Sequence, residues 1–307
     1  LQRWQGARCR DERESCKSEA AGRGPRRQTP RQSALRPIFV FLFALIWTGS
    51  SASSEVILKG KFTQGGLVWG TTVPQAEVHF NGRPIRVSPK GNFLIGFSRD
   101  AAPNATLHVK FPNGQTENQN LEIKKRQYQI QRIEGLPPKM VTPPQAVFDR
   151  IRSENQVIAN ARARDTAQDF FNSGWVWPTF GVISGVFGSQ RILNGIHRRP
   201  HYGIDIAAPV GAPVVSPADA VVAMVHNDMY YTGGTIILDH GHGLTSAMLH
   251  MKQIVVKEGE RVQQGQKIGT VGQSGRSTGP HLDWRINLFE ARLDLAFLVP
   301  PMPIKAE

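Results

Sequence analysis

Cysteine is almost absent from this sequence of 307 residues. Both cysteines, Cys9 and Cys16, lie in the first sixteen positions. The rest of the chain therefore has no disulfide framework and offers no thiolate to a metal ion. A metal site there must be built from imidazole and carboxylate groups.

Long hydrophobic runs are missing as well. The main apolar stretch begins after Arg36, continues for about ten residues to Trp47 and is followed by Thr-Gly-Ser-Ser-Ala52. A basic residue, a short apolar run and a small-x-small end predict a cleaved secretory signal peptide over residues 35–52. The run is too short to span a bilayer comfortably, so we expect no stable transmembrane segment after cleavage. An uncleaved membrane anchor is the alternative.

The first segment is strongly basic and has no apolar period. Residues 1–36 contain ten Arg or Lys and four Asp or Glu, so their removal lowers the net charge from +13 to +7. No methionine precedes Met140. We expect residues 1–34 to be an extension of the gene model or a disordered segment, with Leu35 as a non-standard start. The remaining positive charge suits an anionic envelope polymer or lipid head groups, with general basicity as the alternative. No basic and aromatic stripe indicates a nucleic-acid partner.

Short strands separated by turns are expected from residue 54 to residue 134. The segments that mix β-branched and aromatic residues are 56–62, 77–80, 92–97 and 106–111. Asn81-Gly82 and Asn113-Gly114 favour tight hairpins. This pattern predicts a small antiparallel, immunoglobulin-like β-sandwich. His79 and His108 lie within its strands and are interpreted as packing or surface residues.

A proline-rich joint and a linker helix are predicted over residues 135–174. Thr142 and Gln145 fit a capping box, and Pro143 suits the first helical position. Apolar residues then recur at helical spacing up to Phe171. We expect this amphipathic helix to pack on one of the two domains, with a partner-binding helix as the alternative.

Residues 175–300 return to strands and glycine turns. Thr235–Asp239 and Gly269–Gly272 are typical of strands, and no long helical period occurs between residues 178 and 288. His240-Gly-His242 follows the first of these strands, and its flanking glycines favour a hairpin turn over a pair of metal ligands. This domain is therefore also predicted to be mainly β.

Seven of the nine histidines fall between His197 and His281. One phrase places His201 four residues before Asp205, and another places His281 two residues before Asp283. Side chains two or four apart in a strand share a face, so each pair can point into one groove. A catalytic divalent-metal site uses three such protein ligands and keeps a fourth position for water.

Six phrases from Trp177 onward occur in a set order and spacing. They are Trp177-Pro-x-x-Gly-x-Ile-Ser, His201-Tyr-Gly-Ile-Asp-Ile-Ala-Ala-Pro, Ile237-Leu-Asp-His-Gly, Leu249-His-Met, Val256-Lys-Glu-Gly-Glu-Arg-Val-x-x-Gly-Gln-x-Ile-Gly and Ser274-Gly-Arg-Ser-Thr-Gly-Pro-His. Residues 177–288 thereby resemble the lysostaphin-type (LytM-like) zinc metallopeptidases, which cut peptide cross-links of bacterial cell walls. The fifth phrase alone is also typical of lipoyl and biotinyl carrier domains, but the lysine that those domains modify is missing.

The resemblance implies roles for individual residues. His201 and Asp205 correspond to metal ligands, and His250 and His281 correspond to the two catalytic histidines that are not ligands. The third ligand of the family is a histidine, and this chain has Asp283 in its place. Aspartate is a competent zinc ligand, although two carboxylates favour harder cations more than two histidines do. The resemblance thus implies one Zn²⁺ per chain, or another divalent metal.

The implied function is that of an exported zinc metalloendopeptidase of the periplasm or cell envelope. It hydrolyses peptide cross-links of peptidoglycan by metal-activated water, at the D-alanyl–diaminopimelate bond. An envelope protein is a further expected partner, and the N-terminal sandwich serves as a spacer, a regulatory cover or a wall-binding module. The alternatives are a catalytically degenerate member that binds the wall or activates a separate wall amidase, and a purely structural wall-binding module.

Overall fold

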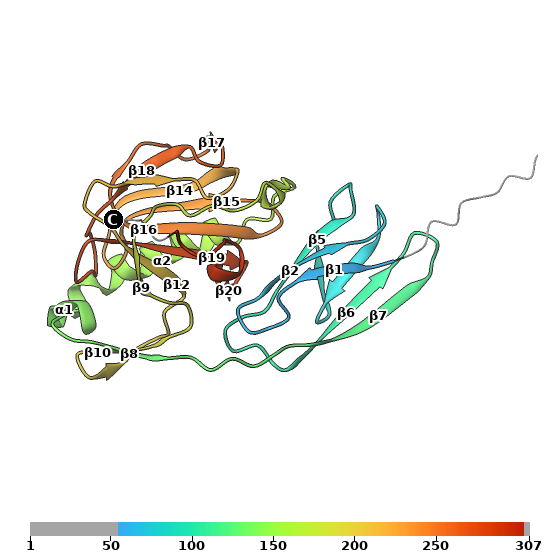
Figure 1. Ribbon diagram of the computed structural model, residues 1–307, viewed down its shortest axis with the longest axis horizontal. Coiled ribbons are helices and arrows are strands. Elements are labelled where there is room, and N and C mark those ends of the chain that lie inside the picture. The colour runs from blue at the N-terminus through green and yellow to red at the C-terminus, as the bar shows by residue number, and fades with distance from the viewer. Residues whose placement is uncertain (1–54, 304–307) are drawn as a thin grey trace, which may run out of the picture. The chain divides into compact units, whose positions relative to one another are not determined.

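The computed structural model describes residues 55–303 (Figure 1). The predicted extension and signal peptide lie outside these residues. The described chain is mainly β with antiparallel sheets, as the sequence predicts. Within residues 55–303, none of the helices has the length and apolar character needed to cross a membrane.

Two antiparallel sheets form the N-terminal sandwich. The first has the order β1 (Ile57–Gly60), β2 (Leu67–Thr71) and β5 (Asn92–Gly96). The second has the order β4 (Arg83–Ile85), β3 (Glu77–Phe80), β6 (Asn104–Lys110) and β7 (Thr116–Glu122). Alternate residues of both sheets share one apolar core, which joins Phe93 and Ile95 to Val78 and Leu107. The β3–β4 hairpin turns at Asn81 and Gly82, whose φ angles of 49° and 76° are those expected of this dipeptide.

The linker contains β8 (Ile130–Ile133), α1 (Pro138–Val141), the 3-10 turn η1 (Gln145–Val147), α2 (Phe148–Arg162) and the 3-10 turn η2 (Phe170–Asn172). The predicted capping box is wrong, because the long helix begins at Phe148 and has no side-chain cap. Pro143 holds Thr142 in an extended conformation with ψ at 95°, and Pro144 is extended too, so the helix starts only after both prolines.

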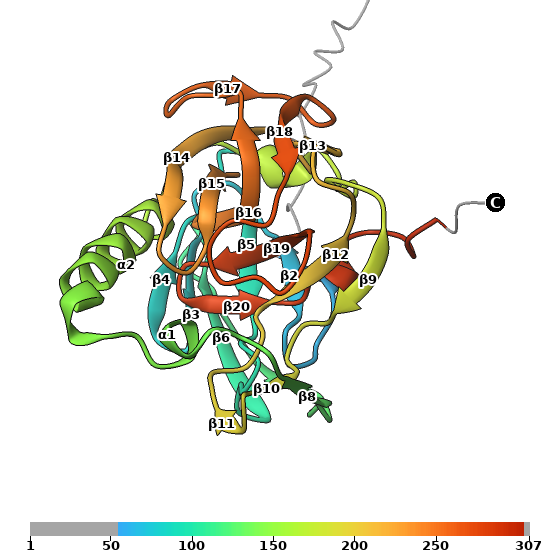
Figure 2. The same cartoon turned by 90° about the vertical axis from the view of Figure 1, so that its left-hand side faces the viewer.

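Helix α2 packs against the C-terminal sheet (Figure 2). Its residues Ile158 and Ala161 lie in one apolar cluster with Ile237 and Leu249. This contact agrees with the prediction of a packing helix rather than a free one. The helix ends at Arg162 and not at Phe171, where the apolar spacing stops.

The C-terminal sheet has ten strands. Its main path runs β17 (Arg261–Val262), β14 (Ala220–Met229), β15 (Gly233–Asp239), β16 (Leu244–Ile254), β19 (His281–Leu288), β12 (Gly203–Ala207) and β9 (Val182–Gly185). Off this path lie β13 (Pro213–Val215), β18 (Lys267–Val271) and β20 (Ala291–Leu293), followed by the 3-10 turn η3 (Leu295–Phe297). Strand β10 (Gln190–Leu193) pairs with β8 and with β11 (Ile196–His197).

Strands β12 and β19 are neighbours in this sheet. Their antiparallel register sets Asp205 directly opposite Asp283. Leu282 and Trp284, which alternate with Asp283, are fully buried in the core, as the strand pattern predicts. The other face of β19 therefore carries the polar side chains of the candidate site.

Candidate metal centre

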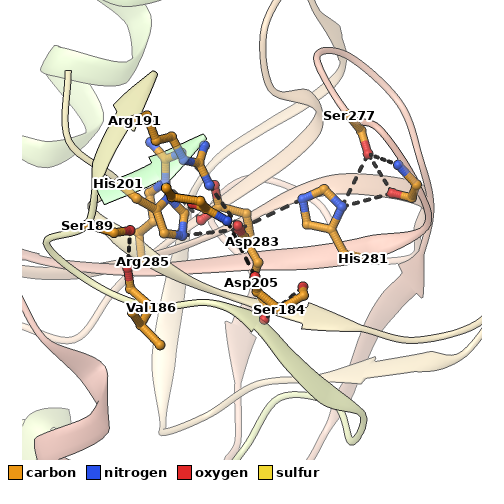
Figure 3. Close-up of polar contacts among 12 residues, drawn as sticks. Ser184, Val186, Ser189, Arg191, His201, Asp205, Ser277, His281, Asp283 and Arg285 are labelled. Carbon is orange, nitrogen blue, oxygen red and sulfur yellow. Dashed lines mark hydrogen bonds and ion pairs between the residues drawn. The ribbon is translucent and has the colours of Figure 1, made fainter. Parts of the chain in front are cut away.

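Three side chains from β12, β19 and the segment before β12 converge on one point (Figure 3). His201, Asp205 and Asp283 each offer one donor atom, and these atoms all lie within 4.8 Å of one another. All three residues are buried, and the described residues contain no other such group of three. The side chain of Asp283 therefore points toward the His201–Asp205 pair, which is the condition that a shared metal ion requires.

The atoms of His201 and Asp205 fit a metal ion better than a hydrogen bond. His201 Nε2 lies 3.1 Å from Asp205 Oδ1. Both atoms are nevertheless buried without a hydrogen-bond partner, because the contact lacks hydrogen-bond geometry. Buried polar atoms without partners are unfavourable. Two ligands of one tetrahedral Zn²⁺ lie about 3.3–3.6 Å apart, which is close to the observed separation.

An arginine binds each carboxylate of this group. Arg191 Nη2 lies 2.7 Å from Asp205 Oδ2. Arg285 donates from Nε to Asp283 Oδ1 at 2.9 Å and from Nη2 to Oδ2 at 2.5 Å. The sequence interpretation missed both arginines. The spacing of two residues within β19 could have indicated Arg285, but no local pattern brings Arg191 of β10 to Asp205 of β12.

These arginines keep both carboxylates ionised. Burial raises the pKa of Asp283, but the charge and hydrogen bonds of Arg285, together with the charges of His201 and His250, outweigh burial and hold the pKa well below its usual range. Burial and the neighbouring Asp283 raise the pKa of Asp205, and His201 and Arg191 reverse that effect, so the net shift is downward. Both side chains are therefore charged at neutral pH and can bind a cation.

Two further histidines border the group. His250 of β16 and His281 of β19 have ring centroids 4.7 Å apart. His250 Nδ1 lies 2.7 Å from the carbonyl oxygen of Ser274, and His281 Nδ1 lies 2.9 Å from that of Gly279. A carbonyl oxygen only accepts, so each Nδ1 carries the proton and each Nε2 keeps a lone pair.

The second nitrogen of His281 is directed at the site. His281 Nε2 lies 3.8 Å from Asp205 Oδ1. Burial lowers the pKa of His250 to about 4, so its ring is neutral at pH 7. The backbone of His250 has a φ of 64°, which is a strained conformation for a residue other than glycine and one that recurs at functional sites.

The pair His240 and His242 serves a different purpose. Strand β15 ends at Asp239 and β16 begins at Leu244, so the two histidines form the predicted hairpin turn. His240 is fully buried, with Nδ1 at 2.8 Å from the carbonyl oxygen of Asp219 and Nε2 at 2.8 Å from Ser246 Oγ. Both of its nitrogens therefore have partners outside the candidate metal centre.

Comparison with known proteins identifies relatives of the C-terminal domain. Residues 199–295 match the model of peptidase family M23. Over 127 residues the chain is 38% identical to peptidoglycan DD-endopeptidase ShyA of Vibrio cholerae, a match that covers 38% of this chain and 29% of that protein. Over 126 residues it is 41% identical to peptidoglycan DD-endopeptidase ShyB of the same organism, covering 41% of this chain and 29% of that protein.

A solved structure extends the likeness beyond this domain. A protein from Pseudomonas aeruginosa whose structure is described as peptidase M23 superimposes with a TM-score of 0.61 at 26% identity. The match covers 78% of this chain and 95% of that chain. By contrast, the chain spans less than a third of the length of the two Vibrio cholerae relatives.

Proposed function

Because residues 199–295 form a peptidase M23 domain, we propose that this chain is an exported zinc metalloendopeptidase that hydrolyses peptide cross-links of peptidoglycan. The observation that carries the proposal is the convergence of His201, Asp205 and Asp283 on one point beside two histidines with available Nε2 atoms. Both Vibrio cholerae relatives are named peptidoglycan DD-endopeptidases, which supports the substrate class. The periplasm or cell envelope is the matching location.

In this proposal His201, Asp205 and Asp283 hold the ion. Bound Zn²⁺ supplies Lewis acidity, which polarises the scissile carbonyl and makes a water molecule acidic at neutral pH. Arg191 and Arg285 balance the two negative charges of the ligand carboxylates. Because their charges are balanced in this way, the two ligand carboxylates would make that water less weakly acidic than two unpaired carboxylates would.

His250 and His281 move the protons in this proposal. Because each Nδ1 donates to a backbone carbonyl, each Nε2 is oriented and able to accept. An Nε2 atom takes the proton of the attacking water, and an imidazole then donates a proton to the nitrogen of the leaving amine as the C–N bond breaks. The neutral state of His250 at pH 7 suits the acceptor step.

Digestion of purified sacculi tests the function. The full chain is expected to release cross-link fragments, a chelator to abolish the release, and added Zn²⁺ to restore it. Asp228→Asn serves as the control variant, because the Asp228 side chain is exposed and, among residues 55–303, forms an ion pair only with Arg150 on the surface. A folded, zinc-loaded chain that leaves all cross-links intact would contradict the proposal.

A specific observation favours a second candidate, a catalytically degenerate member that binds the wall or activates a separate amidase. Arg285 already donates to both oxygens of Asp283, so a cation is present at that carboxylate without a metal. This candidate predicts a folded chain that binds sacculi equally well with and without chelator. It also predicts no stoichiometric zinc after dialysis, which mass spectrometry of the metal content measures directly.

A further inference from the structure

The candidate metal centre opens onto a large cleft. Its volume is about 750 Å³, and it is lined by His201, His250 and Asp283 together with residues of several distant segments. Helix α2 and the segment before it form one wall, and the β10–β11 hairpin and β20 contribute others. A peptide that reaches the metal centre has to contact these walls.

The walls of the cleft carry charge of almost one sign. Of the 26 lining residues, seven are arginines and only Asp283 is acidic. The arginines are Arg162, Arg191, Arg198, Arg199, Arg276, Arg285 and Arg292. A cleft of one sign concentrates ligands of the opposite charge.

Five of these arginines are not neutralised within residues 55–303. Arg191 and Arg285 pair with Asp205 and Asp283, whereas the described residues place no carboxylate within 4.0 Å of the other five. Their positive charge is therefore in excess of what the carboxylates of Asp205 and Asp283 neutralise. The metal centre does not account for it, because a cation there adds further positive charge.

Neutral groups hold three of the five in place. Arg198 Nη2 donates to the carbonyl oxygen of Val141 at 2.7 Å, and Arg276 Nη1 donates to that of Met140 at 3.3 Å. Arg292 Nη1 donates to the side-chain oxygen of Asn287 at 3.3 Å. These hydrogen bonds fix each guanidinium group in position. Because a guanidinium has five N–H donors, each group still keeps donors for a ligand.

Mutual repulsion between the cleft arginines also favours the binding of an anion. Burial and the charges of Arg292 and Arg285 lower the pKa of Arg162 well below its usual range. Burial and Arg285 likewise lower the pKa of Arg292 to about 10. Bound negative charge relieves both effects at once, since it compensates the lost hydration and the repulsion.

We infer that this cleft selects peptides that carry several free carboxylates near the cleaved bond. Guanidinium groups pair with carboxylates through two parallel hydrogen bonds, which gives direction as well as strength. The arginines lie on several distant segments, so they suit several single charges spread along an extended peptide rather than one compact polyphosphate group. The inference rests on the proposed peptidase function and names the substrate feature that the site reads.

A pair of fluorescent peptides tests the inference on the full chain. Both contain a D-alanyl–diaminopimelate bond, and they differ only in whether the other carboxylates are free or amidated. Binding is measured by fluorescence anisotropy in the presence of chelator, so that turnover plays no part. The free-acid peptide is expected to bind at least about tenfold more tightly, which corresponds to about 1.4 kcal/mol.

Variants locate the effect. Arg162→Gln and Arg276→Gln are each expected to weaken the binding of the free-acid peptide by about tenfold and to leave the affinity for the amidated peptide unchanged. Arg152→Gln is the matched control, because Arg152 lies on the same helix as Arg162 and is exposed. The comparison of the two peptides on the unaltered chain does not depend on whether any variant folds.

Two outcomes separate this inference from the proposed function. Equal affinity for both peptides, or stronger competition by inorganic polyphosphate than by the free-acid peptide, overturns the charge selection and leaves the peptidase proposal standing. Tighter binding of the free-acid peptide with no cleavage of either peptide by the zinc-loaded chain supports the charge selection and overturns the peptidase proposal.

Discussion

Arg285 and Asp283 form a two-pronged ion pair within a single strand, from the same face of β19. Asp283 is only 1% exposed, so its carboxylate is a buried charge whose partner is built into the next position on that face. The pair explains how an aspartate can occupy a place where the resembled family has a neutral histidine. It also means that a metal ion at this point shares Asp283 with a fixed cation.

Replacement of Arg285 by glutamine separates these two roles. Without Arg285 the buried Asp283 is left uncompensated, so the metal-free chain is expected to lose about 3–5 kcal/mol of unfolding free energy. Zn²⁺ affinity is expected to rise by about tenfold, because a like charge beside the ion has been removed. Urea unfolding and calorimetric zinc titration measure the two effects.

Arg164→Gln is the control for this prediction. It breaks an exposed ion pair with Glu258 and is expected to cost less than about 1 kcal/mol of unfolding free energy. A fall in zinc affinity would mean that Arg285 orients Asp283 for the metal.

Substitution of Asp283 itself tests the third ligand. Asp283→Asn keeps the size of the side chain and removes its charge, so zinc affinity is expected to fall by about 10–100-fold. Asp283→His restores the donor type of the resembled family, and we expect it to retain zinc. Mass spectrometry after dialysis gives the stoichiometry of each variant. Unchanged zinc content and rate in Asp283→Ala would remove Asp283 from the ligand set.

The two bordering histidines are predicted to affect rate without affecting metal content. His250→Ala and His281→Ala each remove an Nε2 proton acceptor and are expected to lower kcat by about 10²–10⁴-fold. Zinc stoichiometry stays near that of the unaltered chain, because neither residue belongs to the group of three donors. His226→Ala is the control, since His226 Nδ1 accepts from the backbone N–H of Asp228 and His226 does not belong to the candidate metal centre. Loss of zinc in His250→Ala or His281→Ala would instead make that histidine a ligand.

The sequence predicted the strands of this molecule better than its helix. Alternation within β19 was sufficient to place Leu282 and Trp284 in the core and Asp283 on the opposite face. The start of α2 was wrong because the capping pattern at Thr142 took no account of two consecutive prolines, which hold the chain extended. Local periodicity reports how a segment can fold, and the neighbouring backbone restrictions decide where it begins.

The candidate site was only partly accessible to sequence reasoning. The resemblance named five residues that the fold brings into one place, from three different segments. Three arginines of the cleft, Arg162, Arg191 and Arg292, were not foreseen as cleft residues, because they meet only through the packing of α2, β10 and β20. Such a cluster has no signature in local spacing, since its members are more than 25 positions apart.

Acid is predicted to destabilise the chain through His240, whose hydrogen-bond partners lie outside the candidate metal centre. Burial lowers the pKa of His240 to about 4, against an ordinary value of 6.5. Between these two pH values the unfolded chain binds a proton that the folded chain excludes, so stability falls as the pH drops from about 6.5 to about 4. The loss amounts to about 3 kcal/mol for this residue, from 1.36 kcal/mol for each pH unit.

Urea unfolding at pH 7.5 and pH 4 measures this loss. The His240→Gln variant is expected to be less stable at pH 7.5, but its stability should depend less on pH. His226→Gln is the control and should follow the unaltered chain. Parallel profiles for His240→Gln and the unaltered chain would show that the acid sensitivity arises from another group, with the buried His250 as the next to test.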